Sequence, residues 1–251
     1  MIAFVREVAP ALARCELSFL PRVAIDVERA RQQHAQYVAE LTALGCRIEW
    51  LPPLPEHPDS VFVEDTAVIV PGLAVITRPG VASRRGEVAS VARSVAAHLG
   101  VRELAAPACL EGGDVLRVGS TLHVGVSGRS NAAGIAQLGA LLGPRGYRVQ
   151  GVAMRDCLHL KSAGTFIPPD PLLANPAWVD PADFGAARVI AVHPQEAFAA
   201  NTLTIGDVTL VSRDYPRTEE RLAAAGIRTR AVDVSELHKA EAALTCLSLL
   251  L

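Results

Sequence analysis

Five polar residues recur at a nearly constant spacing along this 251-residue chain, and each is followed by a short apolar stretch. They are Asp65, Glu111, His159, Asn201 and Cys246, and successive members are separated by 46, 48, 42 and 45 residues. A period of this length is typical of repeat architectures such as propellers. If five such units close into a ring, equivalent positions beside their first strands meet at the axis. The alternative is that polar residues stand beside five strands by chance.

Pairs of predicted strands alternate with single predicted helices, which favours an α/β repeat. Apolar residues at helical spacing predict helices over 26–46, 83–100, 130–143 and 215–226. Short apolar runs predict strands over 61–70, 73–78, 113–119, 121–127, 201–207 and 208–212. The proline-rich stretches 51–60 and 166–181 are interpreted as loops. No low-complexity linker divides the chain, so we expect a single domain over residues 1–251.

The composition argues against several function classes. A net charge of −2 and a pI of about 6.4 argue against a nucleic-acid-binding surface. No apolar run reaches the roughly 20 residues that cross a bilayer, and the first residues lack the pattern of a signal segment. Five scattered cysteines without a C-x-x-C pair fit a reducing compartment, so we expect a cytoplasmic protein. Metal, ATP and dinucleotide motifs are missing from the sequence, and no cofactor is expected.

Cys246 and His159 form the candidate reactive pair. Each residue alone is more typical of a protein core, because most buried cysteines are inert and His159 lies in the apolar context "CLHLK". Together they permit a thiolate nucleophile with a general acid–base beside it. Glu111 could orient His159 and favour its protonated form. The other interpretation of "EGGD" is a turn before a strand, which the paired glycines would suit.

Charged residues near these positions point to a charged ligand. Asp59, Glu64 and Asp65 lie in "DSVFVED", and neighbouring strand residues point to opposite faces, so at most one of Glu64 and Asp65 should face the axis. A carboxylate in a dry pocket needs a cation, which is either an arginine of the chain or the ligand. A planar guanidinium held by charged hydrogen bonds would suit attack by a thiolate. Arg78 and Arg129 follow predicted strands, where they either capture a carboxylate or are solvated at the surface.

Seven segments, in order over essentially the whole chain, resemble the dimethylarginine dimethylaminohydrolase family. They are "DSVFVEDTAVI", "ITRPGVASRRGE", "LEGGDVL", "GVSGRSNAAG", "LHLKSAG", "AANTLTI" and "KAEAALTCLSLL". This family belongs to the guanidino-group-modifying enzymes, together with arginine deiminases and amidinotransferases. The resemblance implies a five-bladed α/β propeller of ββαβ units around a central active-site channel. It also implies hydrolysis of Nω,Nω-dimethyl-L-arginine, and of the monomethyl compound, to L-citrulline and an amine.

The resemblance implies a role for each candidate residue. Cys246 would be the nucleophile, His159 the proton donor to the leaving amine, and Glu111 the support of His159. The other residues would contact a small-molecule substrate: Asp65 with Glu64 at the guanidinium, Asp59 at the α-amino group, Arg78 and Arg129 at the α-carboxylate, Ala240 through its main chain, and Leu17 from a lid loop. The resemblance further suggests a homodimer and a reaction without metal or organic cofactor.

Two other functions remain open on the sequence. An arginine deiminase would act on free L-arginine, but such enzymes generally carry a helical insertion for which this chain has no room. A non-catalytic propeller that binds arginine-like ligands would be expected to lack the Cys246–His159 pair. Agmatine is a poorer substrate candidate if Arg78 and Arg129 bind a carboxylate, because agmatine has none.

Overall fold

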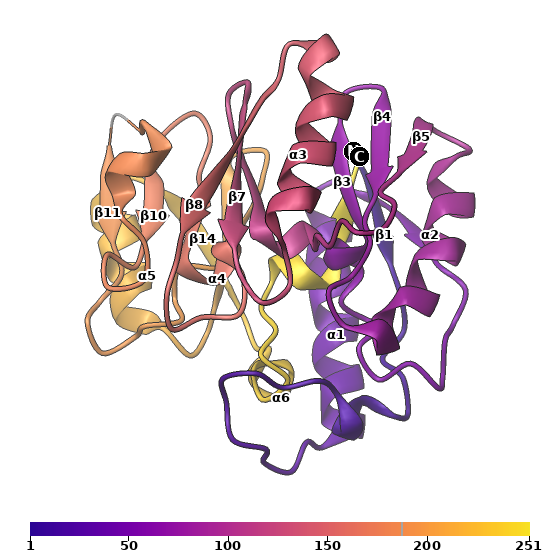
Figure 1. Ribbon diagram of the computed structural model, residues 1–251. Coiled ribbons are helices and arrows are strands. Elements are labelled where there is room, and N and C mark those ends of the chain that lie inside the picture. Colours follow the sequence, from indigo (N-terminus) through magenta and orange to yellow (C-terminus); the bar gives the residue numbers. More distant parts are fainter. Residues whose placement is uncertain (187) are drawn as a thin grey trace.

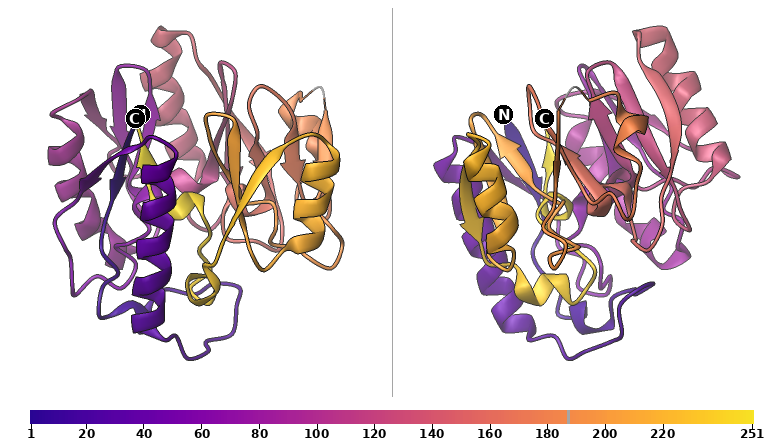
Figure 2. Two further views of the ribbon diagram at one scale, coloured as in Figure 1. Left: turned by 180° about the vertical axis from the view of Figure 1, so that it is seen from behind. Right: turned by 90° about the vertical axis from the view of Figure 1, so that its left-hand side faces the viewer.

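Five three-stranded sheets, here called blades, surround a common axis in the computed structural model, which describes residues 1–186 and 188–251 (Figures 1 and 2). In every blade the first and second strands are antiparallel, and the third strand is parallel to the second. A parallel third strand requires a crossover connection, which a helix commonly provides. The predicted five-bladed α/β propeller of ββαβ units is therefore confirmed.

The blades follow one another along the chain, except that the last blade joins both ends. The first blade contains β3 (Ala67–Val70), β4 (Leu73–Ile76), α2 (Val88–Val95) and β5 (Gly100–Glu103). The second contains β6 (Val115–Val118), β7 (Thr121–Val126), α3 (Ala132–Leu142) and β8 (Arg148–Ala153). The third contains β9 (Gly164–Phe166), β10 (Leu172–Ala174) and β11 (Val189–Ala191), with the short 3-10 helix η6 (Pro181–Phe184) as its crossover.

The last two blades are completed by the C-terminal part of the chain. The fourth contains β12 (Leu203–Ile205), β13 (Val208–Ser212), α5 (Pro216–Ala224) and β14 (Arg228–Val232). The fifth contains β15 (Leu249–Leu250), β1 (Ile2–Val5), α1 (Val27–Ala43) and β2 (Arg47–Trp50). Strand β15 pairs with β1, with Leu249 opposite Phe4, so that the chain ends lie side by side and close the ring (Figure 2).

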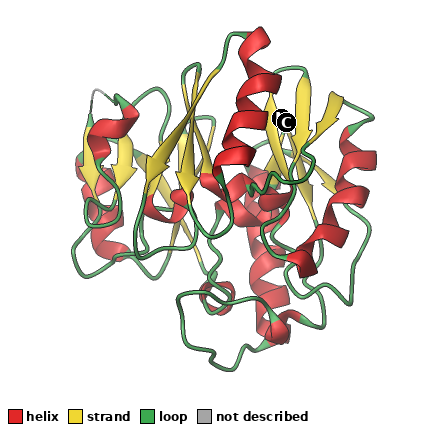
Figure 3. Cartoon of the chain, in the orientation of Figure 1, coloured by secondary structure: helices red, strands yellow, loops and turns green. Residues whose placement is uncertain are grey.

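Short helices precede the first strands of four blades. They are η2 (Val63–Thr66), η4 (Gly112–Asp114), α4 (Leu160–Ala163) and η7 (Thr245–Leu247). Figure 3 shows the helices, strands and loops of the chain. The remaining short elements are η1 (Leu12–Arg14), η3 (Ala82–Glu87), η5 (Gly143–Arg145) and α6 (Ser235–His238). The main-chain N–H and C=O groups of a buried turn have few neighbouring strands to hydrogen-bond with, so they need side-chain partners. This need brings polar side chains to the axis of the propeller.

Helix α1 shows how local sequence sets an element. The carboxylate of Asp26 accepts the main-chain N–H of Arg29 at 3.0 Å and caps the first turn. Gly45, with φ +88°, ends the helix in a left-handed conformation that favours glycine.

Helix α2 packs its buried Val91 and Val95 in a cluster with β1, β3 and β4, and such burial stabilises by about 25 cal/mol per Å² of apolar surface. No helix in the described residues is long and apolar enough to cross a membrane.

Three predicted elements differ from the structure. The predicted strand 61–70 begins only at Ala67, because residues 63–66 form η2 and place their polar side chains near the axis. The predicted helix 83–100 is divided into η3 and α2, and its last residue begins β5. The predicted loop 166–181 contains β10, whose residues 172–174 are fully buried and pair with both neighbouring strands. Proline on either side concealed this short strand.

Candidate active site

A small cavity lies where the turns before the first strands meet, and its walls carry six of the ten predicted site residues. These six are Asp59, Asp65, Arg129, His159, Ala240 and Cys246. Arg84, Glu16 and Glu241 also line it, although none of the three was predicted. The cavity thus combines carboxylates, guanidinium groups, one imidazole and one thiol in a small space.

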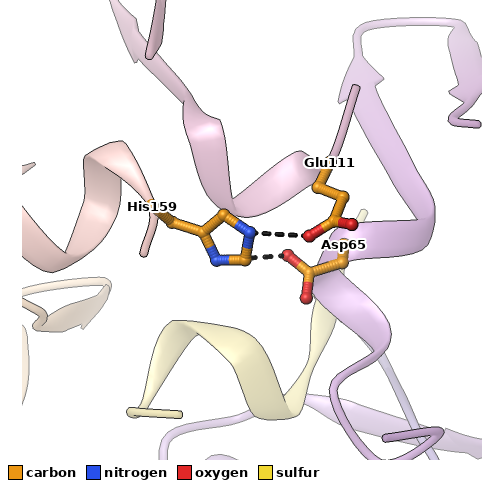
Figure 4. A group of neighbouring side chains, drawn as sticks. All are labelled: Asp65, Glu111 and His159. Atoms are coloured by element: carbon orange, nitrogen blue, oxygen red, sulfur yellow. Dashed lines mark hydrogen bonds and ion pairs between the residues drawn. The ribbon is translucent and has the colours of Figure 1, made fainter. Parts of the chain in front are cut away.

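His159 immediately precedes α4 and is held by a carboxylate on the neighbouring blade. Its Nε2 lies 2.7 Å from Oε2 of Glu111, and its Nδ1 lies 3.8 Å from Oδ1 of Asp65. Figure 4 shows both carboxylates directed at the imidazole ring. Burial alone would lower the pKa of His159, but Asp65, Glu111 and Asp114 raise it to about 9. His159 is therefore an imidazolium at neutral pH. Because Nε2 is bound to Glu111, Nδ1 is the other protonated nitrogen of the ring.

Asp65 in η2 has its own cation in Arg84. Nη1 of Arg84 lies 2.5 Å from Oδ2 of Asp65, while Oδ1 accepts the main-chain N–H of Gly113 at 3.0 Å. Burial alone would raise the pKa of Asp65, but His159 and Arg84 lower it to about 2. Arg84 also pairs with Glu87 at 2.9 Å, and these acids raise the pKa of its guanidinium against the effect of burial. Asp65 is consequently a fixed negative charge beside the His159 ring.

Cys246 lies in η7 and is 8% exposed, in the wall of the same cavity as His159. Burial raises the pKa of its thiol strongly, and the negative charges of Glu64 and Asp65 raise it further. A neutral thiol and an imidazolium therefore share the wall of this cavity. A cation bound next to the sulfur would oppose both effects and favour the thiolate.

The segment 16–20 closes over the cavity through hydrogen bonds to charged residues. The carboxylate of Asp59 accepts the main-chain N–H of Glu16 at 3.2 Å, and Nη2 of Arg129 donates to the hydroxyl of Ser18 at 3.2 Å. Burial raises the pKa of Asp59 to about 6. Two of the three charged groups that were predicted to bind the amino-acid end of a substrate, Asp59 and Arg129, are thus engaged by this segment.

Glu241 holds the same segment from the opposite wall. Its carboxylate accepts the main-chain N–H groups of three consecutive residues, Ser18, Phe19 and Leu20, at 3.0, 2.5 and 2.5 Å. Glu241 itself has φ +58°, a left-handed conformation that costs a non-glycine residue about 1 kcal/mol or more. This conformation directs its carboxylate to a row of N–H groups that would otherwise lack a partner.

Glu64 does not line the cavity of Cys246. Its carboxylate lies 2.5 Å from Nζ of Lys161 and accepts a hydrogen bond from the hydroxyl of Thr245. Together with Lys161 it lines a separate cavity of about 320 Å³ along the axis. Glu64 and Asp65 point in different directions from η2, and only Asp65 faces His159. The expectation that at most one of them faces the axis assumed a strand, but both residues lie in a 3-10 helix and each lines a cavity near the axis.

The structure also separates Arg78 and Leu17 from the cavity wall. Nη1 of Arg78 donates to the main-chain oxygen of Ala108 at 3.1 Å and lies 3.3 Å from Sγ of Cys109. Leu17 is partly buried and packs against the hydrophobic cluster that contains Cys246. The second arginine in the cavity wall is Arg84 rather than the predicted Arg78, because the side chain of Arg78 is directed toward the second blade.

Asn201 behaves differently from the other four members of the periodic set. Its side-chain amide donates to the hydroxyl of Thr245 at 3.0 Å and to the main-chain oxygen of Lys161 at 3.2 Å. Its Oδ1 accepts the main-chain N–H of Thr245. It joins the third and fifth blades at the axis and does not line the cavity of Cys246.

Asp65, Glu111 and His159 offer three ligand atoms within 4.8 Å of one another, which is close enough to hold a metal ion. These atoms are already engaged in ion pairs with each other and with Arg84. A metal cation would also lie next to the guanidinium groups of Arg84 and Arg129. The arrangement suits sharing of a proton between imidazole and carboxylates better than binding of a metal.

Sequence reasoning missed Arg84 and Glu241. A signal for Arg84 existed, since a buried Asp65 requires a cation and "SRRGE" places an arginine three residues before Glu87. No comparable signal identifies Glu241, because neither its left-handed backbone nor the row of N–H groups it binds can be seen in the sequence.

Comparisons with known proteins give a consistent result. The chain is 41% identical over 249 residues to N(G),N(G)-dimethylarginine dimethylaminohydrolase of Streptomyces coelicolor, covering 98% of this chain and 95% of that protein. It is 35% identical to the protein of the same name in Pseudomonas aeruginosa, covering 89% of each. A solved structure of a mutant of the Pseudomonas aeruginosa enzyme in complex with citrulline superposes with a TM-score of 0.92, at 32% identity over 98% of this chain and 97% of that one. No protein-family model matches the chain.

Proposed function

Because the chain belongs to the dimethylarginine dimethylaminohydrolase family of hydrolases, we propose that it converts Nω,Nω-dimethyl-L-arginine, and the monomethyl compound, to L-citrulline and dimethylamine or methylamine. The observation that carries this proposal is a single cavity that contains both Cys246 and a His159 ion-paired with Glu111. A thiol and an imidazolium in one cavity match the needs of nucleophilic attack followed by protonation of a leaving amine. The proposed reaction uses side chains alone.

Substrate binding in this proposal uses the charges of the cavity wall. The guanidinium lies against Asp65, and the α-amino group replaces the N–H of Glu16 at the carboxylate of Asp59. The α-carboxylate is bound by Arg129, with Arg84 as the second nearby cation in place of Arg78. The main chain at Ala240 completes the wall at this end. Support comes from the location of all these groups in one cavity, and the segment 16–20 has to yield its hydrogen bonds to the substrate.

The first chemical step forms a covalent intermediate. The positive charge of the substrate lowers the pKa of the Cys246 thiol, whose proton passes to solvent. The thiolate then forms a bond to Cζ of the guanidinium, and the electron pair of a C=N bond moves to nitrogen. His159 donates the Nδ1 proton to the dimethylated nitrogen, so that the Cζ–N bond breaks and neutral dimethylamine leaves. A thiouronium on Cys246 and a neutral His159 remain.

The second step releases citrulline. Neutral His159 takes a proton from water as the water oxygen forms a bond to Cζ, which restores the imidazolium. The tetrahedral adduct then collapses with cleavage of the S–Cζ bond, and its hydroxyl proton returns the sulfur to the thiol. Glu111 holds the ring in both steps because it remains hydrogen-bonded to Nε2. Substrate and water together thus yield citrulline and amine.

A product assay with three substrates tests this proposal. The protein is incubated with dimethylarginine, L-arginine and agmatine, and dimethylamine, ammonia, citrulline and carbamoylputrescine are measured. Dimethylamine and citrulline in equal amounts are the expected result. Ammonia from L-arginine at a higher rate would instead identify a deiminase. Absence of all products would indicate a binding protein and contradict the proposal.

A further inference from the structure

Asp114 is a fully buried carboxylate to which the reaction above gives no role. It is the last residue of η4 and lies three residues after Glu111. Its Oδ1 accepts the main-chain N–H of Leu160 at 3.0 Å, and its Oδ2 accepts the hydroxyls of Ser127 and Ser130, both at 2.6 Å. Burial raises the pKa of this carboxyl, while the charge of His159 and the three hydrogen-bond donors act against that rise.

The first of these hydrogen bonds fixes the backbone at His159. Leu160 directly follows His159 and provides the first N–H group of α4. The short helix α4 has too few residues to hold its own first turn, so the carboxylate of Asp114 determines where this turn begins. The direction of the His159 side chain depends on the position of the same peptide.

The two serine hydroxyls extend the contact to two further site residues. The hydroxyl oxygen of Ser130 accepts the main-chain N–H of Glu111 at 3.1 Å. The hydroxyl oxygen of Ser127 accepts the main-chain N–H of Arg129 at 3.0 Å. Each hydroxyl therefore donates to Asp114 and accepts from the backbone of a residue in or beside the cavity.

The carboxylate of Asp114 is packed closely against strand β7. A Cβ atom on Gly125 would lie 2.7 Å from Oδ1 of Asp114, so a side chain at this position of β7 would displace it. The charged groups that face the His159 ring are the carboxylates of Asp65, Glu111 and Asp114, and the thiol of Cys246 shares its cavity. Arg84 forms an ion pair with Asp65, and Arg129 forms one with Glu111.

We propose that Asp114 is a positioning residue for the reaction, which fixes His159, Glu111 and Arg129 relative to one another by binding the three segments that carry them. The inference rests on the proposed function, in which these residues are the acid, its support and the carboxylate-binding group. It assigns to Asp114 no contact with substrate. A carboxylate that only stabilised the fold would affect unfolding but not the orientation or charge of His159.

Replacement of Asp114 by Asn tests the proposal with little change in volume. The amide can still accept the N–H of Leu160, but its NH₂ group cannot accept two hydroxyl protons. We expect kcat for dimethylarginine to fall by about 100-fold, because a displacement near 1 Å of an acid or its support has this effect. The alkaline limit of kcat is expected to move to lower pH, since one negative charge near His159 is lost. Ser130→Ala, which leaves the carboxylate in place, should lower kcat by a smaller factor.

Glu196→Gln provides a matched control. Glu196 is also a buried carboxylate, and it accepts main-chain N–H groups of Arg217 and Thr218 at 3.0 and 2.7 Å, but it lies outside the cavity wall. We expect Glu196→Gln to lower the melting temperature without changing kcat or its pH profile. If Asp114→Asn behaved in the same way, the positioning role of Asp114 would be refuted.

A titration of His159 by NMR separates this inference from the proposed function. The His159 signals are followed against pH in the wild-type protein and in Asp114→Asn, without substrate. A lower midpoint alone reports the lost negative charge, so the chemical shifts of the fully protonated and fully neutral ring are compared as well. Changed limiting shifts of His159 in Asp114→Asn support the inference even if the wild-type protein releases no dimethylamine. Unchanged limiting shifts, with or without a lower midpoint, would overturn it, whatever the product assay shows.

Discussion

Cys246 and His159 respond to the same negative charges in different ways. Carboxylates on neighbouring blades raise the pKa of His159 to about 9 and, with burial, also raise the pKa of the Cys246 thiol. In the proposed reaction, His159 is therefore protonated before substrate binds, whereas the Cys246 thiol is not yet ionised. A cationic substrate would add the charge that the thiolate needs, so that binding and activation would occur together. This coupling would restrict attack by the sulfur to ligands that carry a positive charge.

The pH dependence of kcat follows from His159. Its pKa is raised from the ordinary value near 6.5 to about 9, so the imidazolium is retained between these values and lost above about pH 9. A bound guanidinium and a Cys246 thiolate add opposite charges, which leaves this limit nearly unchanged. We expect kcat at saturating substrate to be constant through neutral pH and to fall tenfold per pH unit above about 9. A limit near pH 6.5 would show that the carboxylates do not hold the proton on His159.

Cys246→Ser is expected to lower citrulline formation at least about 1000-fold, because a serine hydroxyl is a far weaker nucleophile at neutral pH. The replacement is close in volume, so circular dichroism and the melting temperature should stay close to those of the wild-type protein. Citrulline formation at an undiminished rate by Cys246→Ser would exclude the covalent route. Cys46→Ser, at a buried cysteine outside the cavity wall, serves as the control and should keep its activity.

The sequence was informative about residues at the axis and less so about their partners. The regular spacing correctly brought His159 to Glu111 and placed Cys246 in their cavity. It did not reveal that Lys161 pairs with Glu64, 97 residues away, because such pairs depend on which blades are neighbours. For the same reason the direction of Arg78 could not be inferred from its position after a strand.

At the scale of elements, the short helices before the first strands shape the cavity. Three of them supply Asp65, Cys246 and the peptides of Gly112 and Gly113, while His159 precedes a fourth. Gly113 lies where η2, η4 and His159 meet, and a Cβ atom there would be 2.7 Å from both Asp65 Oδ1 and His159 Nδ1. Such separations are too short for a real side chain, so glycine is required by close approach.

Gly113→Ala should therefore force Asp65 and His159 apart. We expect kcat to fall by about 100-fold or more, with a loss of stability of about 1–3 kcal/mol from overpacking. Gly139→Ala, inside helix α3, is the matched control. The added Cβ would make only an ordinary contact of 3.7 Å with Val149 of strand β8. This control should be neutral or slightly stabilising. Equal activity of both variants in the citrulline assay would contradict the close packing at Gly113.

Glu241→Ala tests the hold of the segment 16–20 over the cavity. The variant removes the acceptor of three main-chain N–H groups, so hydrogen exchange at Ser18, Phe19 and Leu20 should become faster. We expect KM to fall with a smaller change in kcat, because the segment competes with the proposed substrate for Asp59 and Arg129 but takes no part in bond cleavage. Glu220→Ala, at an exposed position of α5, should leave both constants unchanged. Unchanged exchange rates in Glu241→Ala would show that Glu241 does not hold the segment.

Local patterns predicted the long elements well and the short ones poorly. Helix α1 begins one residue after its cap Asp26, close to the predicted start. The boundary between η2 and β3 was missed because the apolar residues on both sides of Glu64 and Asp65 resemble one continuous strand. The position of such turns depends on polar contacts between blades at the axis, and these contacts form only in the complete fold.

At the scale of the whole molecule, a ring of hydrogen bonds joins each blade to the next near the axis. Gly113 donates to Asp65, Leu160 to Asp114, Asn201 to the oxygen of Lys161, Thr245 to Asn201, and Thr245 again to Glu64. The contact between β15 and β1 closes the same ring at the chain ends. Five-fold closure explains why residues about 45 positions apart become neighbours, and why one period in the sequence indicated a five-bladed propeller and brought Asp65, Glu111, His159 and Cys246 close to its axis.

The central claim is that Cys246 attacks the guanidinium of dimethylarginine in a cavity that the five blades build together. Its most direct test is mass spectrometry of the Cys246 peptide after acid quenching during turnover of dimethylarginine. We predict a thiouronium adduct on Cys246 that forms as dimethylamine is released and disappears as citrulline accumulates. Accumulation of citrulline with no adduct on Cys246, or with an adduct on a different cysteine, would contradict this account.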